Sequence, residues 1–139
     1  MFINGTDWIV RKTNKNLPDL PYEELREYIN KIIVYSQIPG CEPNYETLPA
    51  FKQVEIVLNN STWKNHCLVK AGNKSAIIYV SYNKSPQVRL SCLVHQLVHA
   101  LFPVSPRAWS VYRNQITECR PYEIYANKIA DKIASLKFR

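Results

Sequence analysis

Two histidines stand four residues apart in an apolar run of the C-terminal half of this chain. His95 and His99 belong to the segment LVHQLVHAL, which has the apolar spacing of a helix. Residues at i and i+4 share one helical face, so both imidazoles can approach a single ion from the same side. Imidazole nitrogens are common zinc ligands, and a catalytic zinc site needs three protein ligands plus a position for water. The spacing therefore predicts part of a metal site that lacks one ligand.

Gln96 occupies the position after the first histidine, where the HExxH pattern of metal-dependent peptidases has a glutamate. In that pattern the carboxylate takes a proton from metal-bound water and passes it to the leaving amine. A carboxamide has nearly the same shape but is neutral and cannot act as a general base near pH 7. We therefore predict that a site with Gln96 in the position of the general base binds Zn²⁺ but is inactive or strongly impaired in hydrolysis.

The third ligand must come from another segment, and Glu123 is our prediction. It stands at the start of the predicted last helix, where the helix dipole stabilises a carboxylate and the side chain can project toward a facing helix. Packing that helix against the histidine helix would complete a His-His-Glu set. Three other donors remain open as alternatives: Glu118, Cys119 and Cys92.

Three helices are predicted to position these side chains. The first covers 21–40, with Asp19 as its possible N-terminal cap. The second covers 86–102, with Ser85 placed to cap it, and carries both histidines. The third begins at about Tyr122 and runs toward the C-terminus.

Strand signals occupy the middle of the chain. The segments 54–59, 66–70 and 76–82 combine β-branched and aromatic residues with turn signals between them. The segments 41–50 and 103–121 are predicted to be a loop and a connector. These elements predict an α+β fold in which a small, mostly antiparallel sheet packs on the active-site helix and on a C-terminal ligand helix.

At this point the chain resembles the ImmA/IrrE family of zincin metallopeptidases. The run AIIYVSYNKSPQVRLSCLVHQLVHAL is followed by EIYANKIADKIA. In that family a sheet edge strand precedes an HExxH helix, and a later helix carries an E-x-x-A-N-x-x-A signature whose first glutamate completes the zinc site. Glu123, Ala126, Asn127 and Ala130 match that signature in register, and the resemblance covers roughly 76–136.

The length predicts a single domain over residues 1–139, and the resemblance implies that it is a zincin-like minimal metallopeptidase domain. The resemblance also implies an intracellular peptidase with Zn²⁺ as cofactor and a regulatory protein as substrate or partner, such as a helix-turn-helix repressor. Gln96 is the departure from the family pattern. It is either natural, as in a pseudoenzyme, or a deliberate replacement of glutamate; the otherwise intact surroundings favour replacement, and the sequence does not separate the two.

Other residues near the motif each have two possible roles. Asn127, one turn after Glu123, either holds a metal ligand in place or caps a local turn. Tyr112, Tyr122 and Tyr125 are possible donors to a developing oxyanion, although packing is the ordinary role of a tyrosine in a chain with nine of them. The two histidines themselves could be ordinary helix residues bonded to the backbone.

Composition places the chain among globular proteins. Hydrophobic residues make up 46% and charged residues 21%, and no apolar run is long enough for a membrane span. The start of the chain does not resemble a secretory signal and the four cysteines form no CxxC pair, so we expect a cytoplasmic protein with reduced thiols. The net charge of +7 is scattered along the chain, so we expect no direct nucleic-acid binding.

Three functions follow as hypotheses. With glutamate at position 96, zinc-bound water would attack a peptide carbonyl, and the strand 76–82, as a sheet edge, would pair with an extended substrate. With Gln96 as the natural residue, the domain would be a pseudoenzyme that binds a partner without cutting it. A basic nucleic-acid-associated protein is the third alternative, although the sequence shows no recognition motif for it.

Overall fold

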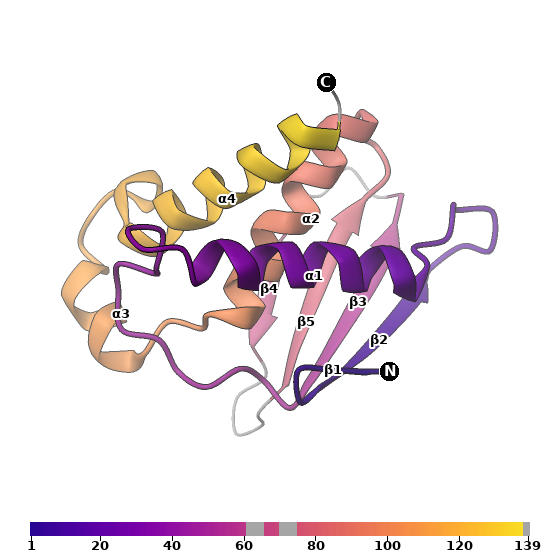
Figure 1. Cartoon of the computed structure of the whole chain (residues 1–139). Coiled ribbons are helices and arrows are strands. Elements are labelled where there is room, and N and C mark those ends of the chain that lie inside the picture. Colours follow the sequence, from indigo (N-terminus) through magenta and orange to yellow (C-terminus); the bar gives the residue numbers. More distant parts are fainter. Residues whose placement is uncertain (61–65, 70–74, 138–139) are drawn as a thin grey trace.

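A computed structural model describes residues 1–60, 66–69 and 75–137, with the backbone alone at 66–69. It shows a mixed five-stranded sheet whose one face is covered by the long helices (Figure 1). None of the described helices is long and apolar enough to cross a membrane. The elements follow in the order β1 (Phe2–Ile3), β2 (Thr6–Lys12), α1 (Tyr22–Ser36), β3 (Gln53–Asn59), β4 (His66–Val69), β5 (Ser75–Ser81), α2 (Pro86–Leu101), α3 (Pro106–Tyr112), the 3₁₀ turn η1 (Thr117–Cys119) and α4 (Pro121–Lys137).

The predicted α+β class is confirmed, and so are the three helices and three strands expected from the sequence. Two parts were missed. The strands β1 and β2 lie in the N-terminal segment, and α3 with η1 lies in the segment 103–121 that was predicted to be a connector. The residue at 70, predicted to end β4, lies outside the described residues.

The expected mostly antiparallel sheet is wrong. The strand order is β1-β2-β3-β5-β4, and the central pairs β2·β3 and β3·β5 are parallel, whereas the outer strands β1 and β4 are antiparallel to their neighbours. Parallel neighbours need a crossover connection, and α1 supplies it between β2 and β3. Without β2, the sequence contained no visible β-α-β unit, so the parallel pairing could not be predicted.

The position of β5 corrects a second expectation. The strand that leads into α2 is an interior strand, because β3 pairs with it on one side and β4 on the other. Its backbone hydrogen bonds are therefore used, and the predicted pairing of the segment 76–82 with a substrate cannot occur. The edge of the sheet on this side is β4.

The core lies between the sheet and the helices. Every second residue of β3 and β5 points toward the helices and is buried, as the alternation of a one-sided sheet requires. The apolar stripe of α2 faces the same core. The most buried residues of this core include Ile29, Ile32, Val54, Ile56, Ile78, Val94, Leu97 and Ile129. This packing holds α2 firmly on the sheet and leaves one flank of the helix, with the histidines, outside the core.

Helix capping differs from the prediction at two positions. Asp19 does not cap α1, because its carboxylate pairs with Lys12 Nζ at 2.6 Å while Pro21 stands at the N-cap. Ser85 does occupy the N-cap of α2 but makes no side-chain capping hydrogen bond. The serine that caps a helix with its side chain is Ser105, whose Oγ accepts from the backbone N–H of Ala108 at 3.0 Å.

We expect the two serines to differ in their contribution to stability. Ser105→Ala should lower the free energy of unfolding by about 1 kcal/mol, because a buried N–H of α3 loses its acceptor. Ser85→Ala is the matched control and should change it by less than about 0.5 kcal/mol. Chemical denaturation of both variants checks this, and equal losses would contradict the capping role of Ser105.

Candidate metal site

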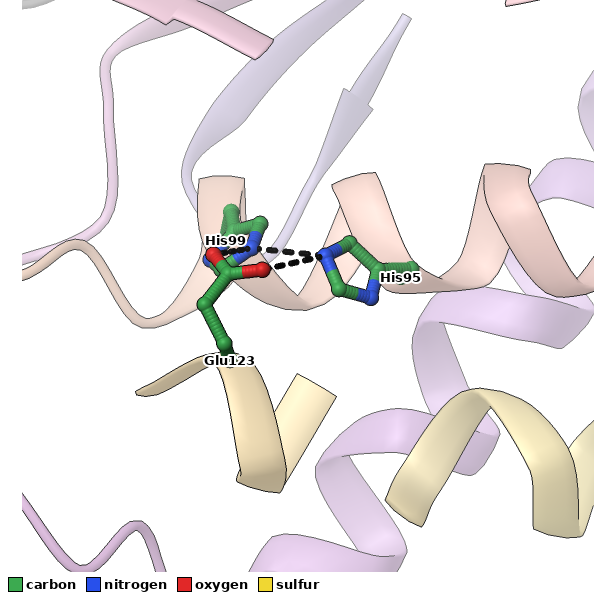
Figure 2. A group of neighbouring side chains, drawn as sticks. All are labelled: His95, His99 and Glu123. Atoms are coloured by element: carbon green, nitrogen blue, oxygen red, sulfur yellow. Dashed lines mark hydrogen bonds and ion pairs between the residues drawn. The ribbon is translucent and has the colours of Figure 1, made fainter. Parts of the chain in front are cut away.

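The packing of α2 against α4 brings His95, His99 and Glu123 together (Figure 2). The distance from His99 Nε2 to Glu123 Oε1 is 2.8 Å, and His95 Nε2 lies 3.3 Å from Glu123 Oε2. The two Nε2 atoms are 2.9 Å apart. Residues from two separate helices thus present two nitrogens and a carboxylate to one point.

Local sequence explains why the helices meet here. Ala126 and Ala130 lie on the buried side of α4, and Ala100 is buried on α2. The separation of packed helices depends on the side chains at their contact, so small residues permit a close approach. Glu123 stands in the first turn of α4, one turn before Ala126, and it therefore projects toward α2 from the end of this close contact.

The carboxylate of Glu123 is ionised at neutral pH. Burial by itself would raise its pKa, but the hydrogen bonds from His95 and His99 outweigh burial and lower the pKa to about 2. A metal ligand of this type must be deprotonated. The carboxylate is therefore ready to bind a cation without first losing a proton.

The geometry fits a metal ion. Zinc binds nitrogen and oxygen ligands at about 2.0–2.2 Å, so neighbouring ligand atoms of a tetrahedral site lie roughly 3.4 Å apart. The three distances here are 2.8, 2.9 and 3.3 Å, and a small outward shift of the side chains would admit the ion. The exposed fractions of the side chains are 15% for His95, 16% for His99 and 22% for Glu123, so a fourth position can reach solvent. This group could hold a metal ion.

Asn127 fixes the orientation of one imidazole. Its Oδ1 lies 2.8 Å from His95 Nδ1, and because a carbonyl oxygen only accepts, the imidazole donates through Nδ1. A ring that ligates a metal ion is neutral, and this hydrogen bond would then direct the lone pair of its Nε2 at the ion. Of the two roles considered for Asn127, this contact supports the one that holds a ligand in place.

Gln96 faces an open groove beside the cluster. The groove has a volume of about 360 Å³, and its lining includes Lys84, Val88, Cys92, His95, Gln96 and Asn127. The side chain of Gln96 is buried, with an exposed fraction of 8%. Position 96 thus lines the same groove as His95, and a glutamine there cannot act as a general base.

The three candidate oxyanion donors lie in different surroundings. Tyr125 donates its hydroxyl to the carbonyl of Cys41 at 3.0 Å, and burial raises its pKa to about 12. The ring of Tyr122 packs edge-on 6.4 Å from the ring of His99, and its buried hydroxyl has no hydrogen-bond partner among the described residues. Tyr112 ends α3 half-buried, and no contact in the described part of the chain joins it to the cluster. Tyr122 is therefore the tyrosine that touches the candidate site.

The alternative ligands lie outside the cluster. Among the described residues, the group able to hold an ion consists of the two histidines and Glu123 alone. Glu118 and Cys119 are exposed in η1, and Cys92 lines the groove. Among the described residues, Cys41 and Cys119 are free thiols.

Sequence reasoning missed Lys84 and Val88, which line the groove at its far end. A signal exists for Val88, because 88, 92 and 96 recur at intervals of four within the helix, whereas Lys84 precedes the helix and has no such signal. Because these residues mix polar and apolar side chains, the pattern has no amphipathic signature and is recognised only once the groove is known.

Comparison with known protein families, with curated proteins and with solved structures finds no match for this chain. The likeness to ImmA/IrrE peptidases thus stays a resemblance of motifs, and the function has to be argued from the site.

Removal of the carboxylate should abolish stoichiometric metal binding. Glu123→Gln keeps the shape of the side chain but removes the charge that faces both imidazoles. Elemental analysis after incubation with zinc and desalting should find about one equivalent in the unchanged chain and a small fraction in this variant. Glu118→Gln is the matched control and should retain the metal; equal metal content in all three would contradict the site.

Asn127→Ala should weaken zinc binding by about 10–100-fold, since the His95 ring loses the partner that orients it. Asn127→Asp keeps an acceptor for Nδ1 and should restore most of the affinity. Competition titrations against a zinc chelator give both constants, and an unchanged affinity in Asn127→Ala would assign the contact a structural role only.

Proposed function

We propose that this chain is a zinc-dependent metallopeptidase domain of the ImmA/IrrE type whose hydrolytic step is impaired by Gln96. The observation that carries the proposal is the convergence of His95, His99 and Glu123, from two helices, beside a groove that is also lined by position 96. An HxxxH pair alone is a weak signal. A carboxylate within hydrogen-bond distance of both imidazoles, at the position expected from the E-x-x-A-N-x-x-A segment, makes it specific.

Each residue of the site has a distinct task in this proposal. His95, His99 and Glu123 hold the ion, and Asn127 keeps the His95 ring in its ligating orientation. When bound, zinc lowers the pKa of a coordinated water to about 7 and polarises a substrate carbonyl. A glutamate at position 96 would accept the proton of that water and deliver it to the leaving amine, whereas Gln96 can only hydrogen-bond.

An extended peptide is the substrate that this architecture suits. The strand β4 forms the edge of the sheet beside α2, and α2 packs against both β4 and β5. An edge strand has unpaired backbone groups on its outer side, and an added peptide strand can use them. We therefore propose that an extended substrate pairs with β4 and not with the segment 76–82.

A regulatory protein, such as a helix-turn-helix repressor, is the target suggested by the resemblance, and a cytoplasmic location belongs to the same proposal. A second function, a binding module that grips its partner without cutting it, is favoured by one observation. Gln96 preserves the volume of the side chain while removing its basicity, so the groove and the metal cluster can remain intact without turnover.

Gln96→Glu should create zinc-dependent peptidase activity. General acid–base catalysis contributes about 10²–10⁴-fold, so the cleavage rate of a proteome-derived peptide mixture should rise by that factor over the unchanged chain. Mass spectrometry of the new termini measures it. The double variant Gln96→Glu with Glu123→Gln controls for contaminating proteases and should produce no cleavage above that of the unchanged chain.

A zinc-loaded Gln96→Glu variant that cleaves nothing in the mixture would sink the peptidase proposal and leave the binding module. Cleavage that persists in the double variant would locate the activity elsewhere.

A further inference from the structure

The groove beside the metal cluster extends along most of α2. Val88, Cys92 and Gln96 recur at intervals of four residues and form one stripe along α2 next to His95, and Lys84, which stands two residues before the helix begins, continues the lining of the groove beyond it. A volume of about 360 Å³ accommodates several side chains, which is more than the chemistry at one peptide bond requires. The groove therefore has room to bind substrate residues remote from the bond that is cut.

The far end of the groove carries a positive charge. Lys84 is exposed, and no carboxylate of the described residues forms an ion pair with it. Val88, with 46% of its surface exposed, separates this charge from the thiol of Cys92. Ser91 also lines the groove, and its Oγ donates a 3.5 Å hydrogen bond to Asp131 of α4, which is not itself among the lining residues. The groove thus has polar and apolar residues along its middle and a cationic end.

The length of α2 sets the number of substrate residues between the two ends. α2 rises about 14 Å from Pro86 to His95, at about 1.5 Å per residue, and Lys84 stands two residues before Pro86. An extended peptide advances about 3.3 Å per residue. The side chain that meets Lys84 is therefore about five residues away from the bond held at the metal cluster.

The sheet sets the direction of the substrate. β4 is antiparallel to β5, and α2 runs back across the sheet in roughly the opposite direction to β5 (Figure 1). A peptide that adds to β4 in the antiparallel sense, which is the slightly more stable pairing, runs parallel to β5 and hence opposite to α2. Its C-terminal part then lies toward the start of α2, where Lys84 stands.

We propose that the groove of α2 binds the part of the substrate on the C-terminal side of the scissile bond, and that Lys84 selects an acidic side chain about five residues beyond that bond. The inference rests on the proposed function for the position of the bond. The recognition of an acidic peptide by Lys84 and Val88 rests on the groove alone. Lys84 is in this view a specificity residue that takes no part in the chemical step.

A binding experiment tests the groove without hydrolysis. The zinc-loaded, unchanged chain is immobilised and used to select from a library of randomised dodecapeptides with blocked ends. Retained peptides should be enriched in Asp and Glu, and Lys84→Glu should shift the enrichment to Lys and Arg. Lys52→Glu, at an exposed lysine before β3 and at the opposite end of the parallel strands, is the control of equal charge. An absent acidic enrichment, or one that Lys84→Glu leaves unchanged, overturns the proposal.

A single exposed charge pair changes affinity by roughly two- to fivefold, and added salt should reduce the effect. Titration of one selected peptide into the unchanged chain and into Lys84→Glu measures this ratio. Equal affinities would count against Lys84.

A cleavage experiment tests the register and direction. Products of Gln96→Glu should show acidic residues at about the fourth to sixth position after the cut, and the added change Lys84→Glu should replace them with basic residues. Acidic residues before the cut, or none, overturn the proposal while the peptidase function stands. If the unchanged chain selects acidic peptides but Gln96→Glu cleaves none, recognition by the groove is supported and the peptidase function is overturned.

Discussion

The contact between α2 and α4 is the constraint on which the site depends. Neither helix carries enough ligands alone, because α2 supplies two imidazoles and α4 supplies the carboxylate. Their relative position is set by buried apolar residues on both helices, and small buried side chains such as Ala126 permit a close approach. The hydrogen bonds from both imidazoles to the Glu123 carboxylate then keep the three candidate metal ligands together even without an ion. A core interaction thus pre-organises a surface site.

The sequence predicted the site better than it predicted the sheet. His95, His99 and Glu123 could be assigned because helical spacing is regular and each residue lies on a strongly periodic helix. The strand pairing could not be assigned for two reasons. The N-terminal segment that contains β2 gave no clear strand signal, and β4, which precedes β5 in the chain, lies beyond β5 in the sheet instead of between β3 and β5. Pairing depends on contacts between distant segments, for which local periodicity contains no information.

Gln96 has an electrostatic consequence for the metal-free protein. The cluster already contains the ionised carboxylate of Glu123, stabilised by the two imidazoles. A glutamate at position 96 would place a second carboxylate near the first, and two like charges in a half-buried site raise the pKa of one of them. A bound cation offsets that repulsion, whereas the metal-free site has no comparable charge. The carboxamide at position 96 adds no such charge.

The same helix would serve both chemistry and selection. The two histidines lie in the C-terminal half of α2 and Lys84 stands two residues before its first residue, so the helix, about 14 Å long from Pro86 to His95, fixes the distance between the proposed metal site and the proposed specificity residue. A loop would let that distance vary, whereas a helix packed on the sheet by its buried stripe does not. Under this proposal, substitutions at 84 and 88 would alter which peptides bind without moving the histidines, because both residues are exposed and lie outside the group of His95, His99 and Glu123. Separation of this kind allows one fold to keep its metal chemistry while its substrate preference changes.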